Sequence, residues 1–339
     1  MARHLILGGG GFIGRHVALA LLRRNDVVVI ANRSPMKEAP PDANGELLSF
    51  VQCDLATAEW DAILLDGDVV HHYACSTIPK TANDDPVGDL DVNVRGTLRL
   101  LEALRKRRGT RLVFPSSGGT VYGPLQHTPV SEDHPLNPIT AYGASKVAIE
   151  KYLGFYRAMY GLDIRIARLS NPYGQGQDPR GKQGAASIFL HLALANQPIE
   201  VWGDGSVVRD YIHIADAVAG LLTVADAEPE LLIDHPIFNI GSGRGVSITD
   251  ILAFLEERLG RALHVTYLPG RQFDVTINVL DIRRARLVLD WFPRLEFRAG
   301  MDLMIRDYVA GLNYSTLLPV FDHSHFAAAK ILASGTIWD

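Results

Sequence analysis

Tyr142 and Lys146 are the residues of this chain whose types and spacing could do chemistry together. They lie four residues apart in the segment Tyr142-Gly-Ala-Ser-Lys146, and on a helix positions i and i+4 project from the same face. A neighbouring ammonium favours the phenolate form, so a phenol that ordinarily titrates near ~10 could act as a base closer to neutrality. Such a base can remove the proton of an alcohol while a hydride leaves the same carbon. Because this spacing also arises by chance in many helices, the interpretation depends on the elements that position the pair.

The N-terminal segment predicts a turn that binds a dinucleotide. His4-Leu-Ile-Leu7 is a short apolar run, Gly8-Gly-Gly-Gly11-Phe-Ile-Gly14 follows it, and apolar residues then recur at helical spacing up to Arg23. A buried strand that leads through a glycine turn into a helix is the arrangement that dinucleotide binding requires. Gly8 permits the tight turn, Gly11 lets the backbone approach a pyrophosphate, and Gly14 allows the helix to pack closely on the strand. The pyrophosphate would lie at the unpaired N–H groups and positive dipole end of that helix.

Hydroxyl side chains follow a later strand. Arg111-Leu-Val-Phe114 predicts a strand, and Pro115-Ser-Ser-Gly-Gly-Thr-Val-Tyr-Gly123 continues it into a turn. In a doubly wound sheet, ligands bind at the carboxyl ends of the strands. Ser116 or Ser117 would therefore hydrogen-bond the reacting alcohol, whereas the same segment taken alone would read as a turn without a role.

Composition describes an ordinary globular protein and excludes several classes. Of 339 residues, 47% are hydrophobic and 21% are charged, and the formal net charge of −5 gives no general field for nucleic acid or an anionic membrane. No apolar stretch approaches the ~20 residues that a membrane span needs. The two cysteines, Cys53 and Cys75, have no neighbours that could complete a metal site, and they indicate free thiols in a reducing compartment. We therefore expect a soluble, cytoplasmic protein without a metal ion.

The alternation of strand-like and helix-like periods predicts an α/β fold with a doubly wound, Rossmann-type parallel sheet. We expect residues 1–170 to form a dinucleotide-binding domain and residues 171–315 mainly a smaller substrate-binding lobe, with the segment near 237–240 returning to the main sheet. In the tail, residues 316–339, Asp322-His-Ser-His325 favours a surface turn over a metal site. Strands are expected at His4–Leu7, Val27–Ala31, Leu48–Val51, Val69–Tyr73, Arg111–Phe114 and Asp163–Leu169, and helices at Phe12–Arg23, Val87–Arg107 and Tyr142–Tyr160.

Together these motifs resemble the extended short-chain dehydrogenase/reductases, and among them the nucleotide-sugar 4-epimerases of the UDP-glucose type. The resemblance spans roughly residues 3 to 310 in unbroken order. Beyond the motifs above it rests on Asp54-Leu55, His72-Tyr-Ala-Cys75, Asn93-Val-Arg-Gly-Thr97, Arg168-Leu-Ser-Asn-Pro-Tyr-Gly174, the segment from Trp202 to His213, Asn239-Ile-Gly-Ser-Gly243 and Arg271-Gln-Phe-Asp274.

The resemblance implies a transient 4-keto sugar and a tightly bound NAD that takes up and returns a hydride. Tyr142 would be the base, Lys146 would keep it charged and bind the nicotinamide ribose, and Ser117 would hold the sugar oxygen. The residues implied at the cofactor are Gly8, Gly11, Phe12, Ile13, Gly14, Asn32, Arg33, Asp54, Leu55, Tyr73, Ala74, Cys75, Asn93, Ser116, Tyr142 and Lys146. Those implied at a nucleotide-diphosphate sugar, UDP-linked, are Ser117, Thr120, Asn171, Arg209, Tyr211, Arg271 and Asn278, with the two arginines on the diphosphate.

The end of the second strand departs from the family pattern. Asn32 occupies the position where NAD-specific members carry a carboxylate for the ribose 2′-OH. Asparagine can still accept a hydrogen bond there, and it does not repel a 2′-phosphate. Arg33 could pair with that phosphate, stack on adenine or face solvent. NAD is favoured because an epimerase returns the hydride in each turnover and needs no NADPH pool, and NADP stays open.

The serine loop carries a second departure. Many members have one residue fewer between the serine and Val121-Tyr122-Gly123, so counting back from Tyr122 reaches Gly118 and counting forward from the strand reaches Ser117. Loops absorb insertions more readily than buried strands, which favours Ser117 and leaves Ser116 as the alternative. The loop has no carboxylate or lysine, which argues against a 4,6-dehydratase or a decarboxylase. A reductase of nucleotide 4-keto sugars needs the same residues and is the main alternative function.

Two further expectations concern substrate size and assembly. Asn278 falls where the resembling epimerases place a residue at the pocket wall, and a small side chain there would admit an N-acetylated sugar. A surface strand facing water is the alternative, and Arg180 and Lys182 in a nearby loop leave a carboxylated sugar open.

Family members pair two helices with their copies in a homodimer. The residues expected to contribute to that contact are Leu98, Leu101, Leu104, Ile149, Tyr152, Leu153 and Tyr156.

Overall fold

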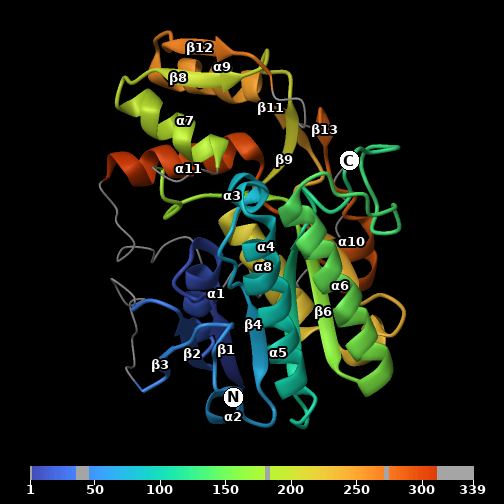
Figure 1. Cartoon of the computed structure of the whole chain (residues 1–339). Coiled ribbons are helices and arrows are strands. Elements are labelled where there is room, and N and C mark those ends of the chain that lie inside the picture. Colours follow the sequence, from blue (N-terminus) through green and yellow to red (C-terminus); the bar gives the residue numbers. More distant parts are fainter. Residues whose placement is uncertain (1, 36–45, 180–183, 271–274, 311–339) are drawn as a thin grey trace, which may run out of the picture.

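The chain folds around a seven-stranded parallel sheet (Figure 1). The structure is a computed structural model in which residues 2–35, 46–179, 184–270 and 275–310 are described. The strands are β1 (Arg3–Leu7), β2 (Val27–Asn32), β3 (Leu48–Gln52), β4 (Val69–His72), β5 (Arg111–Ser117), β6 (Asp163–Leu169) and β10 (Ile237–Ile240). Their order is β10-β6-β5-β4-β1-β2-β3. Strands added outward on both sides of β1 make a doubly wound sheet, so the predicted α/β fold is confirmed.

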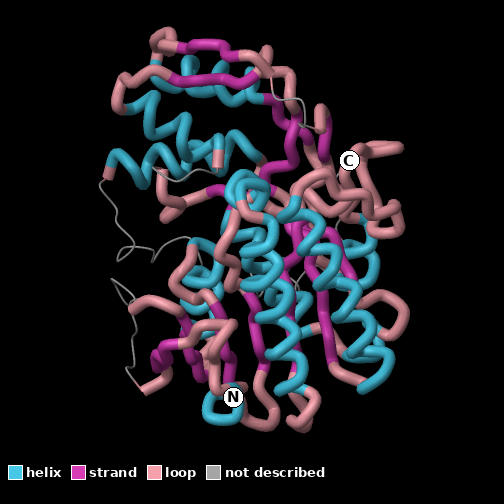
Figure 2. Tube along the Cα trace, in the orientation of Figure 1, coloured by secondary structure: helices cyan, strands magenta, loops and turns pink. Residues whose placement is uncertain are grey.

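Helices cover both faces of this sheet because its strands are apolar on both sides. On one face, α2 (Trp60–Ile63), α5 (Gly96–Leu104) and α6 (Ala141–Tyr160) pack side chains such as Leu101 and Leu153 against the strands. On the other face, α1 (Phe12–Arg23), α8 (Ile214–Asp226) and α10 (Arg283–Leu289) do the same with residues such as Leu21 and Leu221. Figure 2 shows the strands of this sheet running between the helices. Only the ends of the strands are therefore open to ligands.

Two boundaries differ from the prediction where the site is built. β5 runs on to Ser117, so Ser116 and Ser117 are strand residues and not turn residues. The helix predicted over 87–107 is divided into α4 (Pro86–Asp89), a π-helical segment η1 (Leu90–Arg95) and α5, and a short α3 (Pro79–Asp84) precedes it. Within η1 the side chains of Asn93 and Val94 are buried.

The smaller lobe lies next to one end of the main sheet, at the top of Figure 1. One of its sheets contains β7 (Asn171–Tyr173), β9 (Val208–His213), β11 (Gly245–Ser247) and β13 (Ile277–Asn278), and a second contains β8 (Ile199–Trp202) and β12 (Val265–Leu268). Its helices are α7 (Ala185–Leu194), α9 (Ile248–Leu259) and α11 (Phe297–Val309), and a short 3₁₀ turn η2 spans Pro229–Leu232. The two halves interleave along the chain, because α8 and β10 follow residue 170 yet pack on and join the main sheet.

Membrane spans and metal clusters are absent from the described part of the chain. No helix there is long and apolar enough to cross a membrane, and no group of His, Cys, Asp and Glu could hold a metal ion. Both cysteines are free thiols; Cys53 is buried and Cys75 is exposed. Burial raises the pKa of the Cys53 thiol to about 11. The segment from Asp322 to His325 lies outside the described residues.

Candidate active site

The glycine turn after β1 closes tightly on the start of α1. Gly8 has φ +79°, and a Cβ there would lie 2.7 Å from the backbone N of Ala74. A Cβ on Gly14 would lie 2.5 Å from the carbonyl oxygen of Gly8, so both positions require glycine. α1 begins after Gly11, which supplies no side-chain cap. The first N–H groups of the helix, at its positive end, can therefore receive a pyrophosphate.

A cavity of about 260 Å³ extends from this turn along the end of β2. Asn32 Oδ1 accepts a hydrogen bond from the Gly10 N–H at 3.0 Å, and Asp54 Oδ1 accepts one from the Ala56 N–H at 2.9 Å. The helix terminus and this pocket are continuous through the glycine turn, so the residues present fit the phosphates and adenosine of a dinucleotide. The predicted cofactor residues that line the cavity are Gly8, Gly11, Asn32, Arg33, Asp54, Leu55, Tyr73, Ala74 and Cys75.

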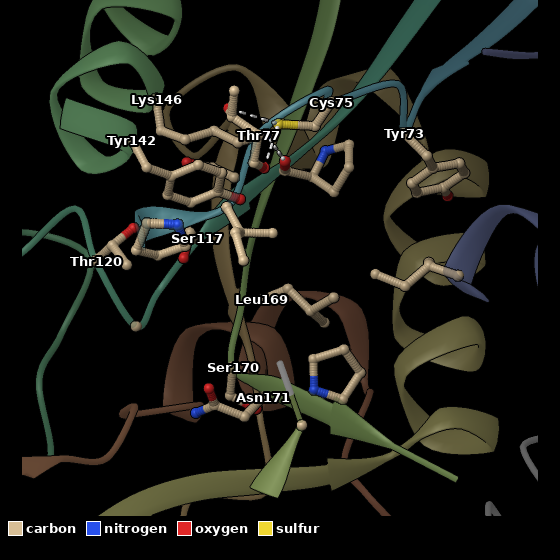
Figure 3. Close-up of a pocket in the computed structure, with 18 of the residues that line it drawn as sticks. Tyr73, Cys75, Thr77, Ser117, Thr120, Tyr142, Lys146, Leu169, Ser170 and Asn171 are labelled. Atoms are coloured by element: carbon tan, nitrogen blue, oxygen red, sulfur yellow. Dashed lines mark hydrogen bonds between the residues drawn. The ribbon is translucent and has the colours of Figure 1, made fainter. Parts of the chain in front are cut away.

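The main cavity, of about 710 Å³, lies between the carboxyl ends of the strands and the lobe (Figure 3). It shares Gly8, Gly11, Tyr73 and Cys75 with the smaller cavity, so the two are continuous. The glycine turn, the serine-rich strand end and the Tyr–Lys pair thus meet in one place. The predicted residues on its wall are Gly8, Gly11, Phe12, Ile13, Gly14, Tyr73, Cys75, Ser116, Ser117, Thr120, Tyr142, Lys146, Asn171 and Arg209.

Helix α6, which carries the Tyr–Lys pair, is fixed at its start and along its length. The hydroxyl of Thr140 caps its first turn by accepting a backbone N–H at 3.1 Å. One turn beyond Lys146, Glu150 forms a buried ion pair with Arg168 of β6 at 2.7 Å. Arg168 also donates to the Tyr122 hydroxyl at 3.1 Å. Because breaking a buried ion pair is costly, these contacts hold the orientation of the helix.

The electrostatics of the pair differ from the expectation based on spacing. The two side chains share a face, with Lys146 Nζ 5.7 Å from the centroid of the Tyr142 ring, and Nζ donates to the Pro115 carbonyl at 3.1 Å. Burial raises the pKa of Tyr142, and the neighbouring Cys75 and Asp89 act in the same direction. Burial also lowers the pKa of Lys146. Desolvation disfavours the charged form of both groups, so the lowering of the phenol pKa expected from the neighbouring ammonium is not found.

Several hydroxyls line the main cavity. Ser116, Ser117 and Thr120 were predicted there, and Ser170 was missed. The side-chain oxygens of Ser116, Thr120 and Ser170 have no hydrogen-bond partner among the described residues, although Ser116 is only 4% and Ser170 only 8% exposed. A buried hydroxyl without a partner costs free energy, so these oxygens are available to a ligand. Ser170 directly follows β6, and the rule that placed Ser116 at the end of β5 would have found it.

A buried carboxylate, Asp89, joins three segments beside the Tyr–Lys pair. It accepts hydrogen bonds from the hydroxyls of Thr77 and Ser145 and, at 2.9 Å, from Asn93 Nδ2. Asn93 Oδ1 in turn accepts the Ser76 N–H at 3.3 Å. Asn93 lines neither the main nor the smaller cavity; its amide holds the wall through these hydrogen bonds, and a contact with the cofactor stays a prediction. No sequence motif signalled Asp89, because its partners come from distant segments.

The lobe supplies the opposite wall, and Figure 3 shows Asn171 and Ser170 across the cavity from Lys146. Asn171 and Arg209 also line a further cavity of about 680 Å³, and Tyr211 lines that cavity alone. Asn171 Nδ2 donates to the Asp210 carbonyl at 2.9 Å, and the Arg209 guanidinium donates to the Val275 carbonyl at 2.6 Å. Arg209 is therefore held where two cavities join, a position suited to a phosphate or diphosphate.

Asn278, predicted as a substrate contact, is buried behind this wall. Asn278 is 1% exposed, donates from Nδ2 to the Gly118 carbonyl at 3.2 Å, and lines none of the three cavities. Its Nδ2 supports the serine loop from behind, while its Oδ1 has no hydrogen-bond partner among the described residues. The alternative of a strand facing water is therefore wrong, and a contact with the substrate stays a prediction. Arg271, Arg180 and Lys182 lie outside the described residues.

Comparison with known proteins finds a family model over more than half of the chain and relatives that span most of it. The model of the NAD dependent epimerase/dehydratase family matches residues 4–241. A UDP-glucose 4-epimerase of Mycolicibacterium smegmatis is 34% identical over 304 residues, which are 88% of this chain and 96% of that protein. A dTDP-4-dehydro-6-deoxyglucose reductase of Escherichia coli is 31% identical over 309 residues, which are 89% of this chain and 96% of that protein. The crystal structure of UDP-glucose 4-epimerase from Thermotoga maritima with UDP-glucose has a TM-score of 0.82 at 29% identity, and the match covers 92% of this chain and all of that one.

Proposed function

The chain belongs to the NAD dependent epimerase/dehydratase family, and on this premise we propose that it is a nucleotide-sugar 4-epimerase. Its substrate is a UDP-hexose and its cofactor is NAD. The sugar passes through a transient 4-keto form, and no net oxidation results. The observation that carries the proposal is the meeting of a dinucleotide cradle and a proton-transfer pair, since the glycine turn and Tyr142–Lys146 line one cavity.

Tyr142 moves the proton of the sugar 4-hydroxyl. When bound, oxidised NAD supplies the hydride acceptor for the sugar C4 and a positive charge that favours the phenolate of Tyr142. The Tyr142 oxygen takes the hydroxyl proton, holds it while the carbonyl exists, and returns it. Ser117 holds the sugar oxygen beside Tyr142, and the unpartnered hydroxyls of Ser116 and Thr120 lie on the same wall.

Lys146 acts through its charge and its hydrogen bonds. Its Nζ donates one hydrogen bond to the Pro115 carbonyl, which leaves two N–H donors for a ribose hydroxyl and the phenolate. Burial lowers its pKa, and the negative charges of Glu150 and Asp89 oppose that lowering. These carboxylates therefore help to keep the ammonium charged in a desolvated site.

The nucleotide portion of the substrate fits the 680 Å³ cavity beyond Arg209. Its wall combines aromatic and apolar side chains, including Phe189, Trp202 and Tyr211, with few polar groups, which is typical of a site for a flat base and its ribose. The diphosphate would then lie at Arg209 and the sugar between Arg209 and Tyr142. Because Asn278 does not line this path, we keep the plain UDP-hexose as the principal substrate and a UDP-N-acetylhexosamine as the second one to assay.

Conversion of UDP-glucose without added dinucleotide tests the activity. Purified protein is incubated with UDP-glucose, and UDP-galactose is measured by chromatography. We expect equilibration of the two sugars, and denaturation of the same sample should release NAD at near-stoichiometric amounts. Protein that carries NAD but converts neither UDP-glucose nor UDP-N-acetylglucosamine would overturn the proposal.

A second candidate is a reductase of nucleotide 4-keto sugars. It is favoured by the E. coli reductase, 31% identical over nearly the whole chain, and by Asn32, which replaces the carboxylate of NAD-specific members. A reductase consumes NADPH or NADH stoichiometrically and leaves the UDP-hexose assay blank. Elimination or decarboxylation is less well supported, because the loop Ser117-Gly118-Gly119-Thr120 has no carboxylate.

We also propose that the protein is a homodimer through the outer faces of α4–η1 and α6. Five of the residues expected there face the core of their own subunit, since Leu101, Leu104, Ile149, Leu153 and Tyr156 are at most 6% exposed. Other apolar side chains remain outside on these elements: Val87, Leu90, Tyr152, Phe155, Met159 and Tyr160. Light scattering should give twice the chain mass of 37.1 kDa, and Phe155→Asp with Met159→Asp should halve it. The single-chain mass at all concentrations would contradict a dimer.

A further inference from the structure

The end of β2 presents a hydrogen-bond donor where a carboxylate would present acceptors. Asn32 is the last residue of β2 and lines the 260 Å³ cavity. The Gly10 N–H lies 3.0 Å from its Oδ1. Because a backbone N–H can only donate, the atom that faces it must be the amide oxygen. The NH₂ group is then the part of the side chain that a ligand in the cavity can meet.

Arg33 adds a positive charge to the same wall. Its side chain is exposed at the cavity, and within the described ranges it has no ion-pair partner. Gln52 Nε2 donates to the Arg33 carbonyl at 3.1 Å, which fixes the point where the side chain leaves the strand. Among the described lining residues the carboxylate is Asp54, whose Oδ1 already accepts the Ala56 N–H at 2.9 Å. The wall therefore carries no net negative charge.

These groups do not discriminate against a phosphate on the adenosine ribose. A carboxylate at position 32 would repel such a phosphate, which carries about −1.5 to −2 charges near neutral pH. The Asn32 amide can donate to a hydroxyl or to a phosphate, and the Arg33 guanidinium favours the phosphate. We propose that this chain binds NADP as well as NAD, with Asn32 and Arg33 as the residues that decide it. The inference rests on the dinucleotide site of the proposed function and not on the identity of the sugar.

Calorimetric titration of the full-length protein, cleared of nucleotide, with NAD and with NADP tests this inference. We expect the two dissociation constants to lie within ~10-fold of each other, and the NADP affinity to fall more steeply with salt. Asn32→Asp should weaken NADP by at least ~10-fold and leave NAD within ~3-fold, because it restores the repulsion. Arg33→Ala, at an exposed position, should weaken NADP several-fold more than it weakens NAD. Arg95→Ala, which removes an arginine that is 68% exposed on η1, is the matched control and should change neither.

The outcomes separate this inference from the proposed function. NAD binding without NADP binding would overturn the inference and leave the epimerase proposal intact. An unchanged NAD-to-NADP preference in Asn32→Asp would overturn the assignment of that residue and with it the inference. Binding of both dinucleotides without conversion of a nucleotide sugar would support the inference and remove the proposed function. Binding of neither would remove both.

Discussion

The two ends of the main sheet use buried polar groups in opposite ways. At the amino end, Arg165 is fully buried, and its guanidinium donates to Asp163 of its own strand and to backbone carbonyls at the end of α8 at 2.7–3.0 Å. At the carboxyl end, the hydroxyls of Ser116, Thr120 and Ser170 have no partner among the described residues. Arg165 is thus matched with partners from the protein itself, whereas these three hydroxyls are kept for a ligand.

We infer from this difference that the polar groups described at the amino end serve stability and that those at the carboxyl end serve function. Burial alone would raise the pKa of Asp163, but hydrogen bonds from Arg165 and Arg111 hold it below its ordinary value; the ionised pair is favoured, and the positive groups suit the C-terminus of α8. At the carboxyl end burial raises the pKa of Tyr142 and lowers that of Lys146, so ionisation there is disfavoured until a ligand compensates it. A substitution at the carboxyl end should therefore lower activity and leave the free energy of unfolding unchanged. A substitution at the amino end should lower the free energy of unfolding and leave activity unchanged.

The largest effect should follow Tyr142→Phe. It removes the oxygen that carries the proton and keeps the ring that fills the site. We expect epimerisation to fall by at least ~10²-fold, while the free energy of unfolding and the stoichiometry of bound dinucleotide stay as in the parent. Tyr152→Phe, on the exposed face of α6, is the matched control and should retain activity. Near-parental turnover of Tyr142→Phe would remove Tyr142 as the base.

Arg165→Met should show the opposite pattern. The change leaves Asp163 and several carbonyls of the α8 terminus without their donor, and we expect the free energy of unfolding to fall by about 2–4 kcal/mol. Turnover per folded molecule should not change. Urea unfolding and an activity assay on the same sample measure both quantities. A loss of turnover without a loss of stability would show that the two ends are not separate.

Lowering the pH should reduce the free energy of unfolding, whereas the phenolate form of Tyr142 is favoured at high pH. Burial lowers the pKa of His72 to about 3 and that of His16 to about 4, from 6.5 in the unfolded chain. Below pH 6.5 the unfolded chain therefore binds more protons, and the free energy of unfolding should fall as the pH falls, by up to about 1.4 kcal/mol per pH unit for each histidine. Urea unfolding at pH 7 and pH 5.5 measures this, and His16→Asn should reduce the slope. Equal stability at the two pH values would contradict the burial of these groups as neutral imidazoles.

Asp89→Asn tests the polar network around Asp89, and we expect its effect to be intermediate in size. The carboxylate holds Thr77, Asn93 and Ser145 and, by its charge, raises the pKa of Tyr142. Its removal should lower turnover by ~10-fold through loss of alignment and move the acid limb of the pH–rate profile to lower pH, because the phenol becomes more acidic. Ser145→Ala removes one hydrogen bond and keeps the charge, so it should lower turnover without moving that limb. An unshifted profile in Asp89→Asn would leave Asp89 a structural role alone.

Ser170→Ala should have the smallest effect on activity, and it should still show that this carboxyl-end hydroxyl contributes to function and not to stability. Its hydroxyl has no partner among the described residues, so the free energy of unfolding should change by less than about 0.5 kcal/mol. If the hydroxyl meets the substrate, KM should rise by ~3- to 10-fold with little change in kcat. Thr97→Val removes a hydroxyl that donates at 2.6 Å to the Asn93 carbonyl, and this control should lose stability. Unchanged KM in Ser170→Ala would exclude Ser170 from the substrate site.

The features that sequence predicted well are local in the chain. The glycine turn, the helix Phe12–Arg23 and the strand Asp163–Leu169 are specified by residue type and period over a few positions, and their observed bounds agree with the prediction. The Tyr–Lys spacing likewise placed both side chains on one helix face. The parallel sheet then follows from the alternation of strands and helices.

The features that sequence missed depend on contacts between distant segments. Asp89 meets Ser145 across 56 positions, and no local pattern marks that contact. Asn93 and Asn278 were predicted at ligands because of their positions in the family resemblance, and sequence did not reveal that their Nδ2 groups donate to Asp89 and to the Gly118 carbonyl. Spacing also placed Lys146 beside Tyr142 but did not reveal the burial that raises the pKa of one and lowers the pKa of the other.

The fate of the hydrogen on the sugar C4 tests the central claim most directly. UDP-glucose carrying deuterium at C4 is incubated with the protein in ordinary water, and the UDP-galactose formed is examined by mass spectrometry and NMR. The account predicts that the deuterium remains at C4 of the product, because the hydride leaves and returns within one cavity while only the hydroxyl proton passes through Tyr142. UDP-galactose that has exchanged this deuterium for solvent hydrogen would contradict it.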